Sequence, residues 1–228
     1  MNLSLPQQAA TGSRTNAQLR DEATQRMIAT AIRLIAEKGA SRVSLVDVGR
    51  EAGYSHSLPN YYFETKSGLL QQVYTHIIQA AGGKIVRWCR KTLPDPVRPG
   101  MSNVRATIRA YLALVGEDPA ATRAMHILWA EAVSSLPELL DIVRPMNKRT
   151  LDFFGAELRE AMRRGEIDPQ TDVDMMSLLI MSTLRGAVAQ HMADPEQVDL
   201  NQVAEALIAL LDRGIGIKPN ALAGEVRP

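Results

Sequence analysis

Apolar residues recur along most of the chain at intervals of three and four positions, the spacing of an amphipathic α-helix. The first such segment runs from about Arg20 to Lys38, where Ile28, Ile32 and Ile35 fall on one face. Gly39 follows this segment as a helix stop signal. No segment shows sustained alternation of apolar and polar residues, so the sequence predicts an all-α fold.

Two short helices are predicted to meet at a glycine between residues 44 and 70. Ser44 and Asp47 have the three-residue spacing of a capping box at the start of the first helix. Gly53 makes the turn, and the second, very short helix is expected to begin near Ser55. This arrangement is typical of a helix-turn-helix motif, which presents the first side chains of its second helix to the major groove of DNA.

The rest of the chain is predicted to be helical as well, starting with a long amphipathic helix from about Lys66 to Lys91. The segment TLPDPVRPG at 92–100 is the clearest break and is interpreted as a hinge between a head and a body. Five further helices are expected over about 101–116, 119–134, 136–164, 172–192 and 199–213. The predicted organisation is a disordered arm at 1–19, a three-helix helix-turn-helix domain at 20–66, a helical body at 67–213 and a frayed tail at 214–228.

The net charge of +1 gives no sign of a nucleic-acid partner, but the charges are unevenly distributed. Residues 1–110 contain 15 Lys and Arg against 7 Asp and Glu, whereas residues 111–228 contain 11 against 18. The resulting +8 and −7 suggest a head that binds a polyanion and a body with another role. The alternative is an uneven scatter of charge without functional meaning.

The chain has one cysteine, Cys89, which excludes an internal disulfide framework and fits a reducing compartment. A packing role is favoured for Cys89, although neighbouring Arg87, Arg90 and Lys91 could lower its pKa. The N-terminus lacks the regions of a secretory signal, and the most apolar stretch, 175–184, is too short to cross a membrane. We therefore expect a cytoplasmic protein with no membrane partner.

Candidate DNA-contacting positions cluster on the second short helix and at the start of the long one. His56 and Asn60 could hydrogen-bond to base edges, and Leu58 could contact a thymine methyl group. A tyrosine hydroxyl beside such a motif commonly meets a phosphate, and Lys66 would complete a phosphate clamp. The predicted DNA-binding residues are Ser44, Ser55, His56, Ser57, Leu58, Asn60, Tyr61, Tyr62 and Lys66.

The stretch from about Ala23 to Leu70 resembles the DNA-binding head of the TetR/AcrR family of bacterial transcriptional regulators. The matching elements are the first-helix pattern followed by Ser44, Val48, Gly49, Ala52, Gly53, Ser55, Tyr62, Phe63, Lys66, Leu69 and Leu70. Ser57, Pro59 and Asn60 depart from the common family residues, and the Leu-Pro pair is similar to the BetI-like branch, which contains choline-responsive regulators. These departures lie on the reading helix, so they bear on the operator sequence rather than on DNA binding itself.

The resemblance implies that the body is a ligand-binding and dimerisation domain whose last two long helices pack against a second copy. The apolar stripes that fit this role are Met175, Leu178, Leu179, Met181, Ser182, Val188 and Ala189 in one helix and Val203, Leu207, Leu210 and Leu211 in the other. The alternative is that both stripes face only the core of the monomer.

A ligand pocket is expected among the central helices of the body. Its candidate residues are Met125, His126, Trp129, Phe153 and Phe154, for each of which core packing is the alternative. His126 or Glu131 could supply a polar anchor for the ligand. No group of His, Cys, Asp and Glu has metal-ligand spacing, so neither a metal nor a cofactor is expected.

The function expected from these observations is a homodimeric repressor that binds double-stranded operator DNA and is released by an unknown small-molecule effector. One alternative is a constitutive DNA-binding regulator without a ligand, which predicts a solidly filled body. A second alternative is an enzyme, but the chain contains no glycine-rich phosphate loop and no nucleophile-elbow motif.

Overall fold

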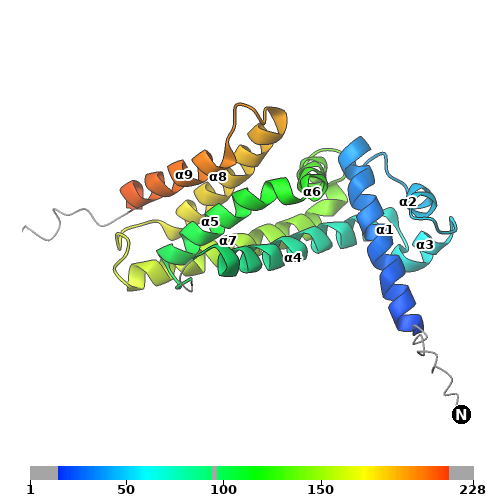
Figure 1. The fold of residues 1–228 in the computed structure, drawn as a ribbon, viewed down its shortest axis with the longest axis horizontal. Helices are drawn as coiled ribbons and strands as arrows, with labels where there is room; N and C mark the ends of the chain where they lie inside the picture. The colour runs from blue at the N-terminus through cyan, green and yellow to red at the C-terminus, as the bar shows by residue number, and fades with distance from the viewer. Residues whose placement is uncertain (1–14, 94–96, 216–228) are drawn as a thin grey trace, which may run out of the picture.

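The computed structural model describes residues 15–93 and 97–215, and all the elements of these residues are helices (Figure 1). The elements are α1 (Asn16–Lys38), α2 (Leu45–Glu51), α3 (Leu58–Phe63), α4 (Lys66–Thr92), α5 (Met101–Ala113), the 3₁₀ helix η1 (Leu114–Glu117), α6 (Pro119–Ala132), the 3₁₀ helix η2 (Pro137–Leu139), α7 (Leu140–Arg163), α8 (Val173–Ala193) and α9 (Leu200–Ile215). The predicted all-α class is confirmed. The helices from α4 onward begin and end within a few residues of their predicted bounds.

The first helix, α1, begins at Asn16, four residues earlier than the sequence predicted. Thr15 forms a capping box with Gln18, because each side chain accepts a hydrogen bond from the backbone N–H of the other residue, at 3.2 and 2.8 Å. Residues 15–19, which were assigned to the arm, therefore belong to the helix and its cap. The remaining predicted arm, 1–14, lies outside the described residues. At the other end α9 continues to Ile215, so residues 214 and 215 of the predicted tail belong to this helix. The rest of the predicted tail, 216–228, lies outside the described residues.

The first hydrophobic core joins the helix-turn-helix head to the body. Ile35 of α1, Val48 of α2 and Phe63 of α3 are all buried, and the same core contains Leu70 of α4 and Leu128 of α6. Full burial of a side chain of this size stabilises the fold by about 1.5–3 kcal/mol. One continuous core therefore extends across the boundary that was predicted at residue 66.

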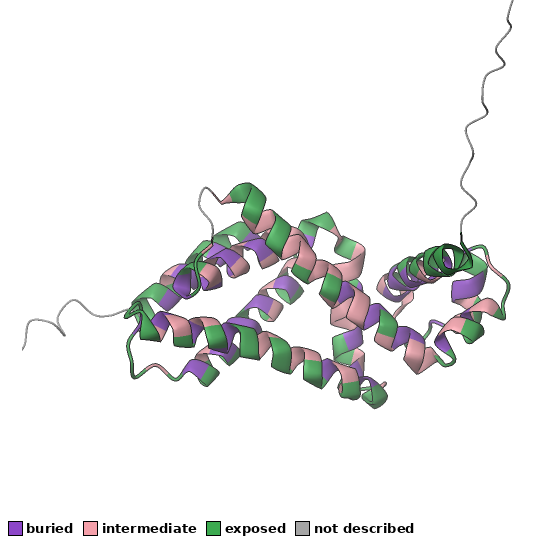
Figure 2. Cartoon of the chain, turned by 90° about the horizontal axis from the view of Figure 1, so that it is seen from below, coloured by how far each residue is buried: buried purple, intermediate pink, exposed green. Residues whose placement is uncertain are grey.

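The second core lies in the body among α5, α7, α8 and α9, whose buried faces turn toward one another (Figure 2). At the edge of this core Cys89 of α4 places its Sγ 3.9 Å from the carbonyl oxygen of Ala106. Burial raises the pKa of the Cys89 thiol, which favours the packing role over a reactive one. No helix in residues 15–93 or 97–215 has both the length and the apolar character needed to cross a bilayer.

The predicted hinge at 92–100 is not the junction between head and body. α4 ends and α5 begins at the side of the body that is remote from the head, and residues 94–96 of the segment lie outside the described residues (Figure 1). The prediction was wrong because prolines mark a break in the helix without indicating which parts of the fold the break separates. The head instead meets the body at the start of α4, where the Thr65 hydroxyl accepts a hydrogen bond from the Gly68 N–H at 3.0 Å.

Candidate DNA-binding and ligand-binding sites

The turn between α2 and α3 is longer than predicted, and α3 is shorter. The Leu58 N–H donates to the Ser55 carbonyl at 3.2 Å, and α3 begins only at Leu58 with Pro59 in its first turn. Proline lacks a backbone N–H and is tolerated at a helix start, where that group has no helical partner. Ser55, His56 and Ser57 therefore lie in the turn that precedes α3, which corrects the predicted helix start near Ser55.

Close packing of two residues sets how α3 lies on α2. A Cβ added to Gly49 would lie 3.0 Å from the Pro59 ring and 3.0 Å from the Ser55 carbonyl oxygen. Gly53 in the intervening turn has a φ of +79°, a left-handed conformation that favours glycine. These glycines allow α3 to lie close against α2, on the side of α1 that is remote from the body (Figure 1).

Most of the predicted DNA-binding side chains are accessible at this end of the molecule. Those that are exposed are Ser44, Ser55, His56, Ser57, Asn60 and Tyr61, and those that are half-buried are Leu58, Tyr62 and Lys66. The Ser44 hydroxyl is already engaged, because it accepts from the Asp47 N–H and donates to the Asp47 carboxylate at 2.8 Å. The Arg20 guanidinium lies over both Tyr61 and Tyr62, 5.7 and 5.5 Å from the ring centroids.

Lys66 and Glu131 both form hydrogen bonds with Ser41, in the loop between α1 and α2. The Lys66 ammonium donates to the Ser41 carbonyl at 2.6 Å, which leaves its other two N–H donors for a further partner. Glu131 of α6 accepts hydrogen bonds from the Ser41 N–H and the Ser41 hydroxyl, at 2.7 and 2.6 Å. Glu131 thus contacts the head. It does not line the large cavity described below, so the structure does not place it as the ligand anchor that the sequence suggested.

The positive charge of the first half of the chain is not concentrated in the head. Residues 15–66 contain seven Lys and Arg against six Asp and Glu, so the excess comes from α4 onward and from Arg14. Several head cations are paired: Arg33 contacts Glu37 and Glu51, at 3.0 and 3.2 Å. The +8 of the first half therefore overstated how basic the DNA-binding surface is.

A cavity of about 630 Å³ lies between α4, α6, α7 and α8. Its volume is in the range of small-molecule sites, and its wall is mainly apolar. Three of the predicted ligand residues, Met125, His126 and Trp129, line it. Phe153 and Phe154 do not, because Phe154 is buried in the second core and Phe153 is exposed.

His126 brings an unsatisfied polar atom to this wall. Its Nδ1 lies 2.9 Å from the Thr122 carbonyl oxygen, which can only accept, so Nδ1 carries the proton. Its Nε2 is buried and has no hydrogen-bond partner among the described residues. Buried polar atoms are nearly always paired, so the Nε2 atom marks a place where a bound molecule or water would complete the wall.

The sequence did not predict four polar residues of the cavity, Tyr74, Asn147, Ser182 and Arg185, of which Ser182 had been assigned to the dimer surface. Burial raises the pKa of the Tyr74 phenol, against the effect of the nearby Arg185 charge, so the phenol stays protonated. Arg185 did carry a signal in the sequence, since it is the only charged residue from Met175 to Gln190 in an otherwise apolar helix. A lone charge on such a helix indicates either an ion pair or a polar site.

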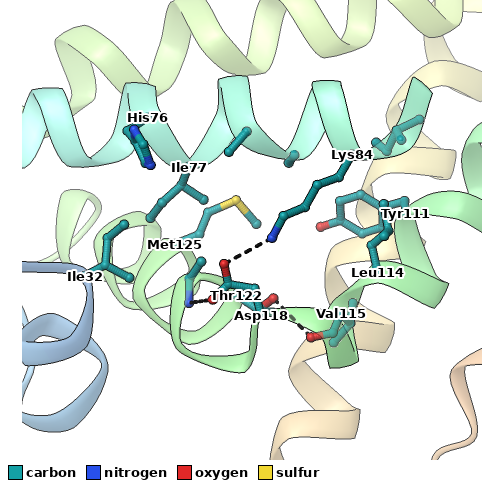
Figure 3. A pocket seen from close by; sticks show the side chains of 14 residues that line it. Ile32, His76, Ile77, Lys84, Tyr111, Leu114, Val115, Asp118, Thr122 and Met125 are labelled. Atoms are coloured by element: carbon teal, nitrogen blue, oxygen red, sulfur yellow. Dashed lines mark hydrogen bonds and ion pairs between the residues drawn. The ribbon is translucent and has the colours of Figure 1, made fainter. Parts of the chain in front are cut away.

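Two further cavities flank α6. The smaller, of about 90 Å³, lies beneath α4 and is crossed by an ion pair between Lys84 and Asp118 at 3.1 Å (Figure 3). The other, of about 430 Å³, lies between α1, the start of α6 and the end of α8. The 630 Å³ cavity is the largest of the three. Among the three, only this cavity is lined by His126 and Trp129, whereas Met125 also lines the 90 Å³ cavity.

Comparisons with known proteins agree with this two-part arrangement. Residues 27–73 match the family model for bacterial regulatory proteins of the tetR family. Residues 101–216, about half of the chain, match the model for the C-terminal region of BetI-type transcriptional repressors. The HTH-type transcriptional regulator BetI of Ectopseudomonas mendocina is 23% identical over 171 residues, which cover 75% of this chain and 85% of the relative.

Solved structures show the same fold at low sequence identity. A transcriptional regulator from Saccharomonospora viridis in complex with choline has a TM-score of 0.72 and 18% identity, over 87% of this chain and all of that one. The regulator FadR from Bacillus subtilis in complex with stearoyl-CoA has a TM-score of 0.70 and 21% identity, over 84% and 98% of the two chains. With its head and its body each matched by a family model, the chain belongs to the TetR family of bacterial transcriptional regulators, with a C-terminal region of the BetI type.

Proposed function

We propose that the protein is a homodimeric repressor that reads operator DNA with α3 and the turn before it and that a small molecule in the 630 Å³ cavity releases it. The family consists of transcriptional regulators, so the enzyme alternative is set aside. The constitutive alternative predicts a filled body, and the size of the cavity counts against it.

The observation that carries the proposal is the position of α6. Within two turns this helix supplies Met125, His126 and Trp129 to the cavity wall and Glu131 to the hydrogen bonds with Ser41 in the head. A ligand that binds better to one position of α6 would therefore favour one position of the head. In a dimer, a change in the separation of the two heads prevents both half-sites from being occupied together.

The proposed dimer surface is narrower than the two stripes read from the sequence. Four residues of these stripes are buried within the monomer, as the alternative of core packing expects: Met181, Val188, Leu207 and Leu211. Four large apolar side chains of α8 and α9 remain exposed: Met175 at 51%, Leu178 at 46%, Leu179 at 50% and Leu210 at 65%. Of these, Leu178 also lines the large cavity. Exposed apolar residues that share a face commonly mark an interface, and a two-fold dimer suits the reading of two half-sites.

DNA binding is tested by selecting sequences from a random duplex library with the purified protein and measuring affinity against salt. We expect selected sequences with two inverted half-sites and an affinity that falls steeply as salt rises. A flat salt response together with no sequence preference would overturn the proposal.

Dimerisation is tested separately with Leu179→Lys and Leu210→Lys, whose side chains are exposed in the monomer and so leave the core intact. Both variants should sediment as monomers and bind the selected operator more weakly. Val86→Lys, at an equally exposed apolar position on α4, is the control and should remain dimeric. Dimers that survive both leucine substitutions would place the interface elsewhere.

A further inference from the structure

The arginine in the large cavity differs from the other half-buried arginines of the described chain. There are three of them, and two hold carboxylates of α9: Arg105 contacts Asp212 at 2.7 Å, and Arg109 contacts Glu205 at 2.6 Å. Arg185 has no carboxylate partner among the described residues. Its Nη2 donates instead to the neutral Asn147 side-chain oxygen.

The surroundings of Arg185 leave its charge uncompensated. None of the 14 residues that line the cavity is Asp or Glu. A guanidinium has five N–H donors in a fixed fork, and a partly buried charge without a counter-charge is costly. A carboxylate is the group that matches this fork, because it can accept two parallel hydrogen bonds.

The same arrangement disfavours a cationic ligand. The Arg185 guanidinium carbon lies 5.5 Å from the centroid of the Trp129 ring, so an arginine already occupies the aromatic face that would attract a quaternary ammonium. A second cation in this cavity would meet the Arg185 charge with no acidic side chain to offset it.

We propose that the effector of this chain is an amphipathic anion, a monocarboxylate whose head group pairs with Arg185 and whose apolar body fills the cavity. Met125, Leu151 and Met181 supply the apolar wall for that body. This inference rests on the proposed function, since it specifies the ligand of the same cavity. It separates this chain from the structural neighbour that was solved with choline.

The inference is tested with the full-length protein and three matched sets of probes: hexanoate, decanoate and tetradecanoate, the corresponding alcohols, and the corresponding alkyltrimethylammonium ions. Binding is measured by calorimetry below the micellar concentration of each probe. We expect at least one carboxylate to bind about tenfold or more tightly than its alcohol, the difference that a charge-assisted hydrogen bond provides, and the ammonium ions to bind most weakly. This comparison uses only the wild-type protein, so it does not depend on how a variant folds.

Arg185→Met then locates the contact. It should remove the advantage of the carboxylate over the alcohol, whereas Arg185→Lys should retain part of it, and Arg149→Gln on the exposed side of α7 should retain all of it. Preference for the ammonium ion or the alcohol, or no binding of any carboxylate, would overturn the inference.

Operator release by the same probes distinguishes this inference from the proposed function. If an ammonium ion or an alcohol releases the operator, the proposed function stands and the anionic effector is wrong. If a carboxylate binds through Arg185 but leaves the operator complex intact, the ligand class stands and the release mechanism fails.

Discussion

The carboxylate of Glu131 accepts hydrogen bonds from both the backbone N–H and the hydroxyl of Ser41, at 2.7 and 2.6 Å. The two residues are 90 positions apart in the sequence, on α6 of the body and on the α1–α2 loop of the head. Charge-assisted hydrogen bonds of this kind are stronger than neutral ones. The pair therefore connects the helix that lines the cavity to the element that positions α2.

Replacing Glu131 with Ala should loosen the α1–α2 loop without unfolding the protein. A hydrogen bond to a charged group contributes about 1.5–3 kcal/mol, so exchange of the Ser41 amide proton should accelerate about tenfold or more. Hydrogen exchange measured by NMR tests this result, and Glu138→Ala, at an exposed position on η2, is the control. An unchanged Ser41 exchange rate would mean that Glu131 does not hold the loop.

Two glycines of α4 should respond in opposite directions to substitution by Ala. A Cβ on Gly68 would lie 2.3 Å from the Phe63 carbonyl oxygen, whereas a Cβ on Gly82 would meet no atom within 4 Å. Gly82→Ala should raise the free energy of unfolding by up to about 1 kcal/mol, because Ala is the better helix former. Gly68→Ala should lower it by about 1–3 kcal/mol despite the same gain, since the α3–α4 junction must move.

Urea denaturation of the two variants measures both changes on one scale. The Gly68→Ala variant should also bind the operator more weakly, because its strain falls on the last residue of α3. Equal stability of the two variants would show that the junction relaxes without cost.

The hydrogen bonds of the Asp47 carboxylate predict that acid lowers the stability of the fold. A hydrogen bond from Ser44, and to a smaller extent one from Lys38, lowers the pKa of Asp47 to about 2. An unperturbed aspartate has a pKa of about 3.9. Because the folded pKa is the lower one, the ionised carboxylate stabilises the fold above about pH 4, and this contribution is lost as the pH falls toward 2. The free energy of unfolding of the wild type should therefore decline more steeply over this range than that of Asp47→Asn.

Denaturation in urea at a series of pH values measures the two slopes. Asp152→Asn, on the exposed side of α7, is the control and should follow the wild type. Parallel slopes for the wild type and Asp47→Asn would show that the carboxylate does not stabilise the fold.

Local chemistry explains why much of the fold could be predicted. The Ser44–Asp47 capping box and the positive-φ glycines at 39 and 53 depend only on residues that are close together in the sequence. A short stretch of sequence is therefore enough to predict them. The start of α3 was misplaced because the turn at Ser55–Leu58 already makes a backbone hydrogen bond of its own before the helix begins.

The candidate sites depend on contacts that no local pattern specifies. The Glu131–Ser41 link joins distant parts of the chain, and only the packing of α6 against α1 brings the residues together. Met125, His126 and Trp129 were found because they share one face of one helix, whereas Arg185 reaches the same cavity from α8. Phe154 has the same apolar character as the residues that were found, but it is buried in the second core.

The residues of the turn and of α3 should separate base recognition from phosphate contact. His56 and Asn60 are exposed and lie at the entrance of α3, where a side chain can reach a base edge. Under the proposed function, His56→Ala and Asn60→Ala should each cost about 1–3 kcal/mol on the preferred operator and little on unrelated DNA. Lys66→Ala should instead weaken binding to both kinds of DNA and reduce the dependence of log affinity on log salt by about one.

Fluorescence anisotropy with the selected operator and with a scrambled duplex, at several salt concentrations, measures all three variants. Lys66 also bonds to Ser41, so its removal could act by loosening the loop instead of by removing a phosphate contact. Lys66→Gln retains a donor for the Ser41 carbonyl but has no charge, and it should therefore show the same reduced salt dependence as Lys66→Ala. If Lys66→Gln keeps the wild-type salt dependence, Lys66 is a structural residue of the head and does not contact phosphate.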